Sequence, residues 1–186
     1  MVENVSKDLA LRWAALLHDV AKPQTFTLDE DNQGHFIGHA ELGAQMADQI
    51  MQRLKAPTAL RERVVFLIEK HMAPLEADKK YLRRRLSRYG KEAVWQLLAL
   101  QQADRIATGT EVDDPRFRQV EQVLRQIEAE DSCLSLKDLA VKGSDLIALG
   151  YEGPAIGKAL QQLLELVLDE QVENEKDALL RALAQL

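Results

Sequence analysis

Apolar residues recur at intervals of three and four along most of this chain of 186 residues, and alternation at period two is nearly absent. Leu42, Met46 and Ile50 form one such stripe. Comparable stripes lie in residues 60–71, 92–107, 115–127 and 154–169. This spacing places apolar side chains on one face of a helix and is typical of amphipathic α-helices that pack on a core. The sequence therefore predicts an all-α fold.

Capping and turn residues indicate where the predicted helices begin and end. Ser6 is expected to cap the first helix and Asn174 the last, because their side chains can accept hydrogen bonds from free backbone N–H groups. Asp78 and Gly90 delimit a short basic helix by the same reasoning. The composition of residues 29–39, "DEDNQGHFIGH", predicts a loop.

The length of the predicted helices and the frequency of glycine change near residue 130. Long amphipathic segments precede this point, and shorter segments punctuated by glycine follow it. We therefore predict two domains, residues 1–130 and residues 131–186, the second being a smaller helical subdomain. No internal repeat and no low-complexity segment accompanies this boundary.

Composition and charge narrow the class of protein. The net charge of −6 argues against a nucleic-acid binder that uses its whole surface, although a local basic patch is compatible with it. The only cysteine is Cys133, so a disulfide framework is excluded. No apolar run reaches the length of a membrane span, and the N-terminal residues lack the apolar stretch of a signal peptide. We therefore expect a cytoplasmic protein with no membrane partner.

Ionisable residues occupy positions that helical periodicity assigns to the core. His18, His71 and Asp104 each lie on the inward stripe of a predicted helix. Burial of a charged group costs several kcal/mol, on the order of the stability of a whole domain, unless the group is paired or bound to a metal. One or two divalent cations would resolve this conflict, because imidazole and carboxylate are suitable ligands for them.

Two further residues complete a candidate metal site. Asp19 follows His18 at a helix end, and His39 begins a helix after Gly38, where the chain can turn tightly. The candidate ligands are His18, Asp19, His39, His71 and Asp104, for Mg²⁺, Mn²⁺, Ni²⁺ or a similar ion. The alternative for any single histidine is a hydrogen-bonded core residue, and an ordinary surface pair is the alternative for Asp104 and its neighbour. His35 is a weaker candidate because it lies in the predicted loop.

A dense basic segment spans residues 79–91. Arg83, Arg84 and Arg88 have helical spacings that could align them along phosphates of a nucleic acid. A solvated helix face is the commoner meaning of such a charge run, so both interpretations stay open.

Several of these segments resemble known motifs. "LLHDVAKP", "GHAELGA", "EKHM" and "QQADRIA" are similar, in this order, to the motifs of the HD superfamily of metal-dependent phosphohydrolases. The segments around them, and the tail from "LSLKDLAVKG" onward, resemble the HD region and C-terminal helices of bacterial tRNA nucleotidyltransferases, the family of CCA-adding enzymes and poly(A) polymerases. The resemblance covers almost the full chain, but nothing in it resembles the nucleotidyltransferase head.

The resemblance implies an HD-type helical bundle with phosphodiesterase or phosphatase activity, for example on 2′,3′-cyclic nucleotides. It implies that Asp19 bridges two ions and is catalytic. Lys22 is a second catalytic candidate that could contact a substrate phosphate, and its alternative is a solvent-facing lysine where Lys22 and Pro23 are expected to stop the first helix. Arg105 is a further candidate for phosphate binding, with a structural role as its alternative. The usual HD pattern starts with an earlier histidine, and residues 1–17 contain none, so one of the two metal positions lacks a ligand.

The sequence is also compatible with two other functions. The chain could be a non-catalytic body that binds tRNA or an RNA 3′ end and supports CCA addition by a head domain. It could instead be a free-standing HD nucleotidase that acts on mononucleotides, although such an enzyme needs no tail of the tRNA family.

Overall fold

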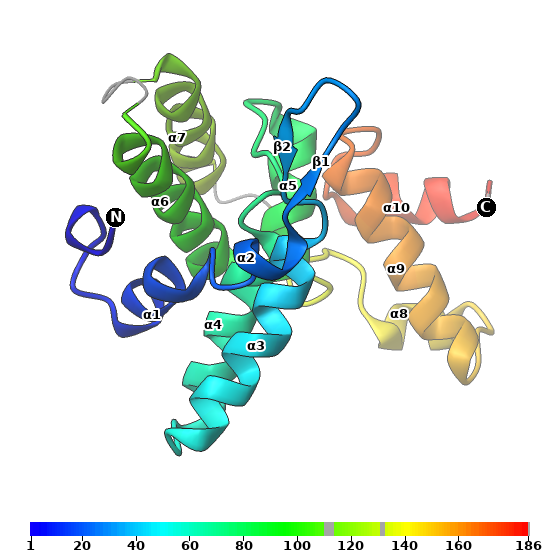
Figure 1. Cartoon of the computed structure of the whole chain (residues 1–186). Helices are drawn as coiled ribbons and strands as arrows, with labels where there is room; N and C mark the ends of the chain where they lie inside the picture. The colour runs from blue at the N-terminus through cyan, green and yellow to red at the C-terminus, as the bar shows by residue number, and fades with distance from the viewer. Residues whose placement is uncertain (110–113, 131–132, 186) are drawn as a thin grey trace. The chain divides into compact units, whose positions relative to one another are not determined.

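The computed structural model describes residues 1–109, 114–130 and 133–185 (Figure 1). Helices make up most of these residues and one short two-stranded sheet accompanies them, which confirms the predicted all-α class. The first half comprises the 3₁₀ helix η1 (Val2–Asn4), the helices α1 (Leu9–Leu17) and α2 (Lys22–Thr25), the strands β1 (Thr27–Leu28) and β2 (Gly34–His35), and the helices α3 (His39–Arg53) and α4 (Thr58–Lys70). The second half comprises α5 (Lys79–Tyr89), α6 (Lys91–Ala107), α7 (Pro115–Ala129), α8 (Gly143–Ala148), α9 (Pro154–Leu168) and α10 (Lys176–Leu183).

The chain forms two compact units that interleave along the sequence. The first unit contains residues 1–75 and 91–117, and the second contains residues 76–90 and 118–186. Packing thus assigns α5 to the second unit, because α5 lies against α9. This division differs from the boundary predicted near residue 130, because that prediction used helix length and glycine content and not the packing of the helices. Asp131 and Ser132, at that boundary, lie outside the described residues. The division into domains 1–130 and 131–186 therefore remains a prediction.

The core of the first unit lies among α1, α3, α4 and α6. Met51, Leu67 and Leu100 are fully buried there. Helices α3 and α4 lie side by side over their length (Figure 1), and small residues such as Ala44 and Ala47 on α3 allow this close approach. The first helix is capped by Asp8, whose side chain accepts a hydrogen bond from the N–H of Leu11, rather than by Ser6 as predicted.

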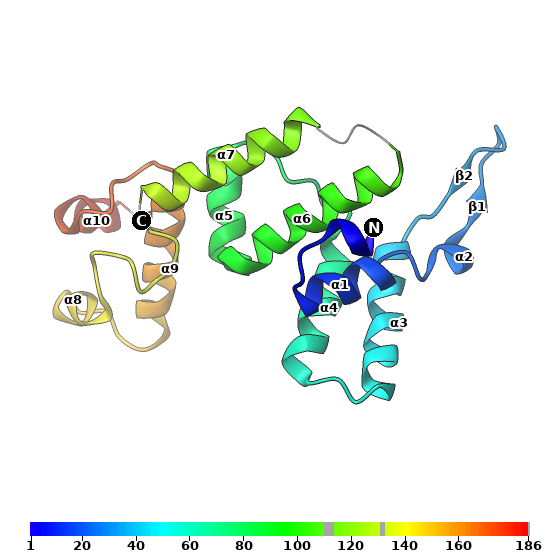
Figure 2. The same ribbon diagram turned by 90° about the vertical axis from the view of Figure 1, so that its left-hand side faces the viewer.

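The predicted loop at residues 29–39 contains part of a β-hairpin. Thr27 pairs with His35 and Leu28 with Gly34. The turn closes on Asp29, whose carboxylate accepts hydrogen bonds from the N–H groups of Asp31 and Gln33. Figure 2 shows the hairpin extending away from the helices of the first unit. A strand pair of two residues each is too short for a period-two pattern, which is why the sequence predicted only a loop.

The second unit has a separate core among α8, α9 and α10. Leu139, Leu163 and Leu179 are fully buried in it. Asn174 does not cap the last helix as predicted. Its amide instead accepts a hydrogen bond from the N–H of Ala140 and donates one to the carbonyl of Asp138, so it ties a distant loop to the start of α10.

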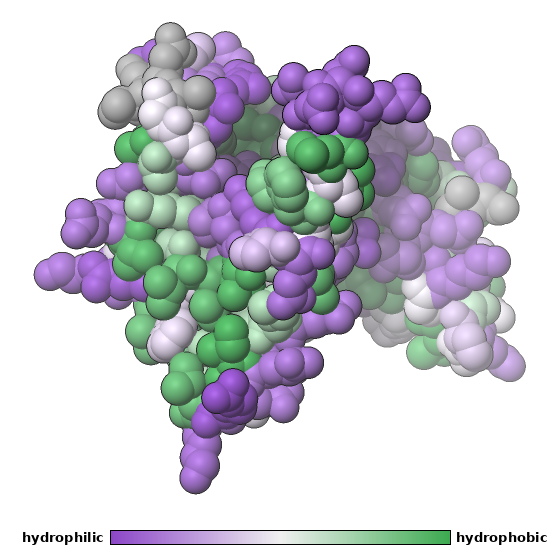
Figure 3. Space-filling view, in the orientation of Figure 1, coloured by the Kyte–Doolittle hydropathy of each residue, from purple (hydrophilic) through white to green (hydrophobic). Residues whose placement is uncertain are grey.

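The surface of the first unit is mixed. Apolar side chains gather over α1 and over the flank of the β1–β2 hairpin, whereas the hairpin tip is hydrophilic (Figure 3). Leu9 and Leu16 on α1 and Leu28 on the hairpin are more than half exposed. Within the described residues, no helix has both the length and the apolar character needed to cross a membrane.

Candidate metal centre

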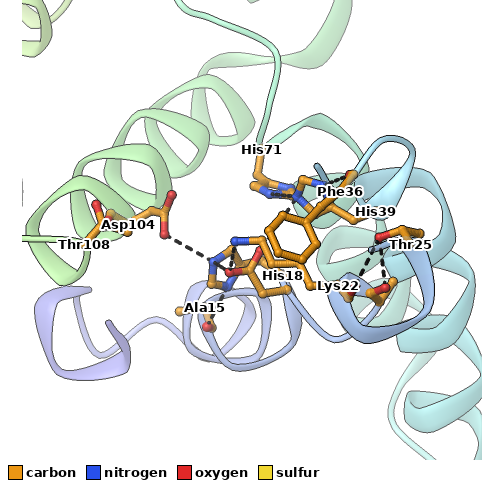
Figure 4. A network of polar contacts seen from close by, with 11 residues as sticks. Ala15, His18, Lys22, Thr25, Phe36, His39, His71, Asp104 and Thr108 are labelled. Carbon is orange, nitrogen blue, oxygen red and sulfur yellow. Dashed lines mark hydrogen bonds and ion pairs between the residues drawn. The ribbon is translucent and has the colours of Figure 1, made fainter. Parts of the chain in front are cut away.

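Four helices of the first unit bring the five predicted ligands together (Figure 4). His18 is the residue at which α1 ends, and Asp19 follows it. His71 has the same place at the end of α4, while His39 is the first residue of α3. Asp104 comes from the last turns of α6. At helix termini the backbone turns away, so these side chains can converge without opening the core.

Each histidine of this cluster is held by a carbonyl of its own chain segment. The Nδ1 atom of His18 lies 3.1 Å from the carbonyl oxygen of Ala15, and that of His71 lies 2.6 Å from the carbonyl oxygen of Ile68. The Nδ1 atom of His39 lies 2.7 Å from the carbonyl oxygen of Phe36. Because a carbonyl only accepts, each Nδ1 must donate, which leaves each Nε2 as the basic nitrogen of the neutral ring. This is the arrangement that orients histidine ligands in metal proteins.

The Nε2 atoms point into one small space with the two carboxylates. The Nε2 atoms of His39 and His71 are 3.2 Å apart. The Nε2 atom of His18 lies 3.2 Å from Asp19 and 3.3 Å from Asp104, yet it forms no well-directed hydrogen bond with either carboxylate. Two groups of three have ligand atoms within 4.8 Å of one another: Asp19, His39 and His71, and His18, Asp19 and Asp104. Asp19 is common to both groups.

The carboxylates and the burial of the rings shift the pKa values in the cluster. Burial lowers the pKa of His18, but its contacts with Asp104 and Asp19 outweigh this and raise that pKa to about 9. Burial lowers the pKa of His71. Burial would raise the pKa of Asp19, but His18 and Lys22 hold that pKa well below its usual range. Without a metal, the excess negative charge of the cluster is therefore offset by a proton on His18.

A cavity of about 770 Å³ opens onto this cluster. Lys22 lies at its border, with its Nζ atom 2.7 Å from the Oδ2 atom of Asp19. Lys22 and Pro23 do not stop the first helix as predicted, because α1 already ends at Leu17 and α2 begins at Lys22. His35, the weaker candidate, lines the same cavity but belongs to neither group of ligands, and it forms an ion pair with Asp29 on the hairpin.

Two residues position the ligands: Gln101, which the sequence did not reveal, and Gly38, which it predicted as a turn. Gln101 of α6 donates hydrogen bonds from its side-chain amide to the carbonyl oxygens of His71 and Ala73, and so fixes the turn after α4. Gly38 adopts a left-handed conformation with a φ of 79° directly before His39. The glycine was visible as a turn residue, but a glutamine that binds a backbone carbonyl far along the chain has no sequence signature.

The basic residues of α5 have different environments from one another. Arg83 is buried, and its guanidinium lies 3.3 Å from Glu170. Arg84 binds both carboxylate oxygens of Asp169, at 2.7 and 2.6 Å. An RNA phosphate would have to compete with these carboxylates. Arg88 is exposed beside the ring of Tyr89. Outside α5, the predicted phosphate ligand Arg105 lies 3.7 Å from Asp114 in the first unit.

A second cavity, of about 750 Å³, lies between α5 and α9 within the second unit. On its α5 side the guanidinium of Arg85 lies between two tyrosine rings, 4.8 Å from the centroid of Tyr81 and 5.5 Å from that of Tyr89. Leu164 and Leu168 of α9 provide apolar lining. Stacked arginine and tyrosine side chains beside an apolar groove are suited to planar, negatively charged ligands.

The fold and the first cluster define an all-helical protein with a group of imidazole and carboxylate side chains that can hold a divalent ion. A protein-family model described as "tRNA nucleotidyltransferase domain 2 putative" matches residues 26–183. The chain belongs to this tRNA nucleotidyltransferase family.

Similar proteins carry related names. An A-adding tRNA nucleotidyltransferase of Deinococcus radiodurans is 38% identical over 163 residues, which are 85% of this chain and 37% of the relative. A CC-adding tRNA nucleotidyltransferase of Thermus thermophilus is 37% identical over 175 residues, 91% of this chain and 38% of the relative. A multifunctional CCA protein of Nitrosococcus oceani is 26% identical over 181 residues, 93% of this chain and 41% of the relative. The chain thus spans less than half the length of these relatives.

Proposed function

We propose that the first unit is an HD-type, divalent-metal-dependent phosphohydrolase whose substrate is a phosphoester, such as a 2′,3′-cyclic nucleotide or an RNA 3′ end. One observation carries this proposal. Three buried imidazoles each donate Nδ1–H to a carbonyl and turn Nε2 toward two carboxylates. A cluster built only for stability would pair the facing Nε2 atoms of His39 and His71 with hydrogen-bond donors, whereas a metal needs them free of protons and would displace the proton of His18.

The donor set fits a hard or borderline divalent ion. Asp19, His39 and His71 would hold one ion, and His18, Asp19 and Asp104 would hold a second. A bound ion would acidify a water molecule and offset negative charge on a phosphoryl group.

The side chains of this chain would then bind and orient the substrate. Lys22 is half exposed at the cavity border, so its ammonium group can bind a phosphate oxygen while it stays close to Asp19. The cavity leaves room for a phosphoester beside the cluster. Nucleotide transfer is not part of this proposal, because we infer that the head carrying that activity is a different region of the relatives.

Metal content tests the proposal directly. The protein is incubated with Mn²⁺, Ni²⁺, Mg²⁺ or Zn²⁺, desalted and subjected to elemental analysis, together with Asp19→Ala and with His35→Ala as a matched control outside the cluster. We expect retained metal in the wild type and in His35→Ala but not in Asp19→Ala. Metal-stimulated hydrolysis of 2′,3′-cyclic nucleotides should disappear in His18→Ala. Hydrolysis that survives this change would contradict the assignment of the site.

A second candidate function, a tRNA-binding body, is favoured by the cavity in the second unit. Arg85 and Arg88 lie on α5 beside tyrosine rings, where they can bind backbone phosphates and stack on bases. The names of the relatives support tRNA as the partner, and a cytoplasmic location would follow from it. The family match over residues 26–183 disfavours a free-standing nucleotidase. The two leading functions are compatible, since one body can bind an RNA and hydrolyse its end.

Salt-dependent tRNA binding tests this second function. Arg88→Gln should weaken binding and lower the slope of log K against log salt by about one. Arg125→Gln, at an exposed arginine of α7 in the same unit, is the matched control and should change little. Absence of tRNA binding at low salt would remove this candidate.

A further inference from the structure

An apolar rim borders the charged cluster of the first unit. Phe36 and Ile37 on one side of the cavity, and Met72 on the other, line the same space as the candidate metal ligands. Ile37 is 82% exposed, and Met72 is 60% exposed. Figure 3 shows apolar atoms on this flank of the hairpin. Large apolar side chains beside a polar site are not needed for folding when they stay in water, and they often mark a ligand surface.

Phe36 lies beside the metal ligands. Its backbone carbonyl oxygen accepts the Nδ1–H of His39, which anchors the backbone of Phe36 to a candidate ligand (Figure 4). The ring of Phe36 packs on Phe26, with centroids 5.5 Å apart. The Nζ atom of Lys22 lies 5.4 Å from the centroid of Phe36 and 2.7 Å from Asp19. One ammonium group thus connects an aromatic ring with the carboxylate shared by both ligand groups.

We propose that Phe36, flanked by Ile37 and Met72, is a stacking platform for the nucleobase of a single nucleotide whose phosphate lies against Lys22 and the metal cluster. This inference rests on the proposed phosphohydrolase function and names its substrate class. A planar base has the shape and the π-face to stack on a phenyl ring, and the adjacent ammonium complements its phosphate.

The surrounding charge limits the occupant to one nucleotide or the last nucleotide of a strand. The hairpin tip carries Asp29, Glu30 and Asp31, and Glu41 and Glu69 border the other side of the cavity. An internal segment of RNA, which continues in both directions, would meet carboxylates on at least one side and be repelled, because Lys70 in the same cavity offsets only Glu69. The geometry therefore favours a mononucleoside phosphoester over an internal segment of RNA.

The test compares adenosine 5′-monophosphate with ribose 5-phosphate, which lacks the base, by calorimetry on the Mn²⁺-loaded protein. We expect the mononucleotide to bind roughly 5- to 100-fold more tightly, the range that stacking on one aromatic ring provides. Phe36→Ala should remove this advantage and leave the affinity for ribose 5-phosphate and the metal content unchanged, whereas Phe36→Trp should keep it. Leu28→Ala removes another exposed apolar side chain of the hairpin outside the cavity, and should have no effect.

A second readout separates this inference from the proposed function. In chelator-treated protein, adenosine 5′-monophosphate should shift the NMR signals of the Phe36 ring more than ribose 5-phosphate does. Such shifts would support the platform even if no metal is retained and the phosphohydrolase proposal fails. Equal affinities of the two ligands in the metal-loaded wild type, with unshifted Phe36 signals, would overturn the platform and leave the phosphohydrolase proposal standing.

Discussion

The Nε2 atoms of His39 and His71 face each other at 3.2 Å, although the two residues are 32 positions apart in the chain. Because both Nδ1 atoms donate to carbonyls, two lone pairs meet in a buried site unless a cation or a proton lies between them. A divalent ion bound to both Nε2 atoms would satisfy the two lone pairs at once.

The first prediction concerns thermal stability and this pair. A saturating divalent metal should raise the melting temperature of the wild type, because a ligand at about 100 times its dissociation constant stabilises the folded state by about 2.7 kcal/mol. In His71→Gln the increase should disappear. Without metal, the same variant should differ little in stability from the wild type, because it loses the hydrogen bond to the carbonyl of Ile68 but its amide can donate to the Nε2 atom of His39. An undiminished metal-induced shift in His71→Gln would contradict the role of this pair.

The second prediction concerns Gln101 as a positioning residue. Its amide fixes the turn that carries His71, so Gln101→Ala should weaken metal binding by about 10-fold, the lower end of the effect of residues that orient ligands. Gln102→Ala, the neighbouring glutamine of α6, serves as the control. Titration with a metal-binding competitor measures both affinities, and equal effects of the two substitutions would argue against a specific role of Gln101.

The third prediction concerns pH and His18 in the metal-free protein. Its pKa of about 9 in the folded protein lies above the ordinary value of 6.5, so its contribution to stability is complete below about pH 6.5 and is lost as the pH rises through 9. Burial lowers the pKa of His71 below its ordinary value of 6.5. The contribution of His71 to stability is therefore complete above about pH 6.5 and is lost as the pH falls below that value. NMR titration of the His18 ring measures the shift. The pKa should fall in Asp104→Asn, and an unchanged value would exclude that carboxylate as a cause.

Metal binding should follow the same titration. A proton on His18 competes with an ion held by His18, Asp19 and Asp104, so occupancy of that group should increase between neutral pH and pH 9. Occupancy of the group formed by Asp19, His39 and His71 does not require deprotonation of His18. Measured metal content against pH should therefore rise in steps rather than in one transition.

The fourth prediction separates the two paired arginines of α5. Arg83 is buried against Glu170, so Arg83→Met should destabilise the protein by about 1–3 kcal/mol, because it removes the charged hydrogen bond of a buried guanidinium while Glu170 keeps only its ion pair with Lys79. Arg84 is largely exposed, and Arg84→Met should cost less than about 1 kcal/mol despite its two hydrogen bonds. Urea unfolding compares the variants. Equal effects would show that burial of Arg83 does not govern its contribution.

The helical periods and helix ends were largely readable from the sequence. Asp78 caps α5 and Gly90 ends it as predicted, because capping depends on a few neighbouring residues. Ser6 and Asn174 were predicted as caps but have other partners, since several polar residues near a helix start can compete for the same N–H groups. The choice between them depends on the packing of the helix end.

The sequence by itself determined which side chains are expensive to bury. Periodicity placed His18, His71 and Asp104 on inward faces, and this is a property of local helix geometry. Only the tertiary structure decided that these faces meet at one point, and that carbonyls orient every Nε2 toward it. Only the tertiary structure pairs Arg83 with Glu170 and Arg84 with Asp169, directly after the end of α9. Helical spacing cannot reveal these pairs. Helical periodicity determines on which face of its helix a residue lies. Contacts between segments that are distant in the chain determine what that face packs against.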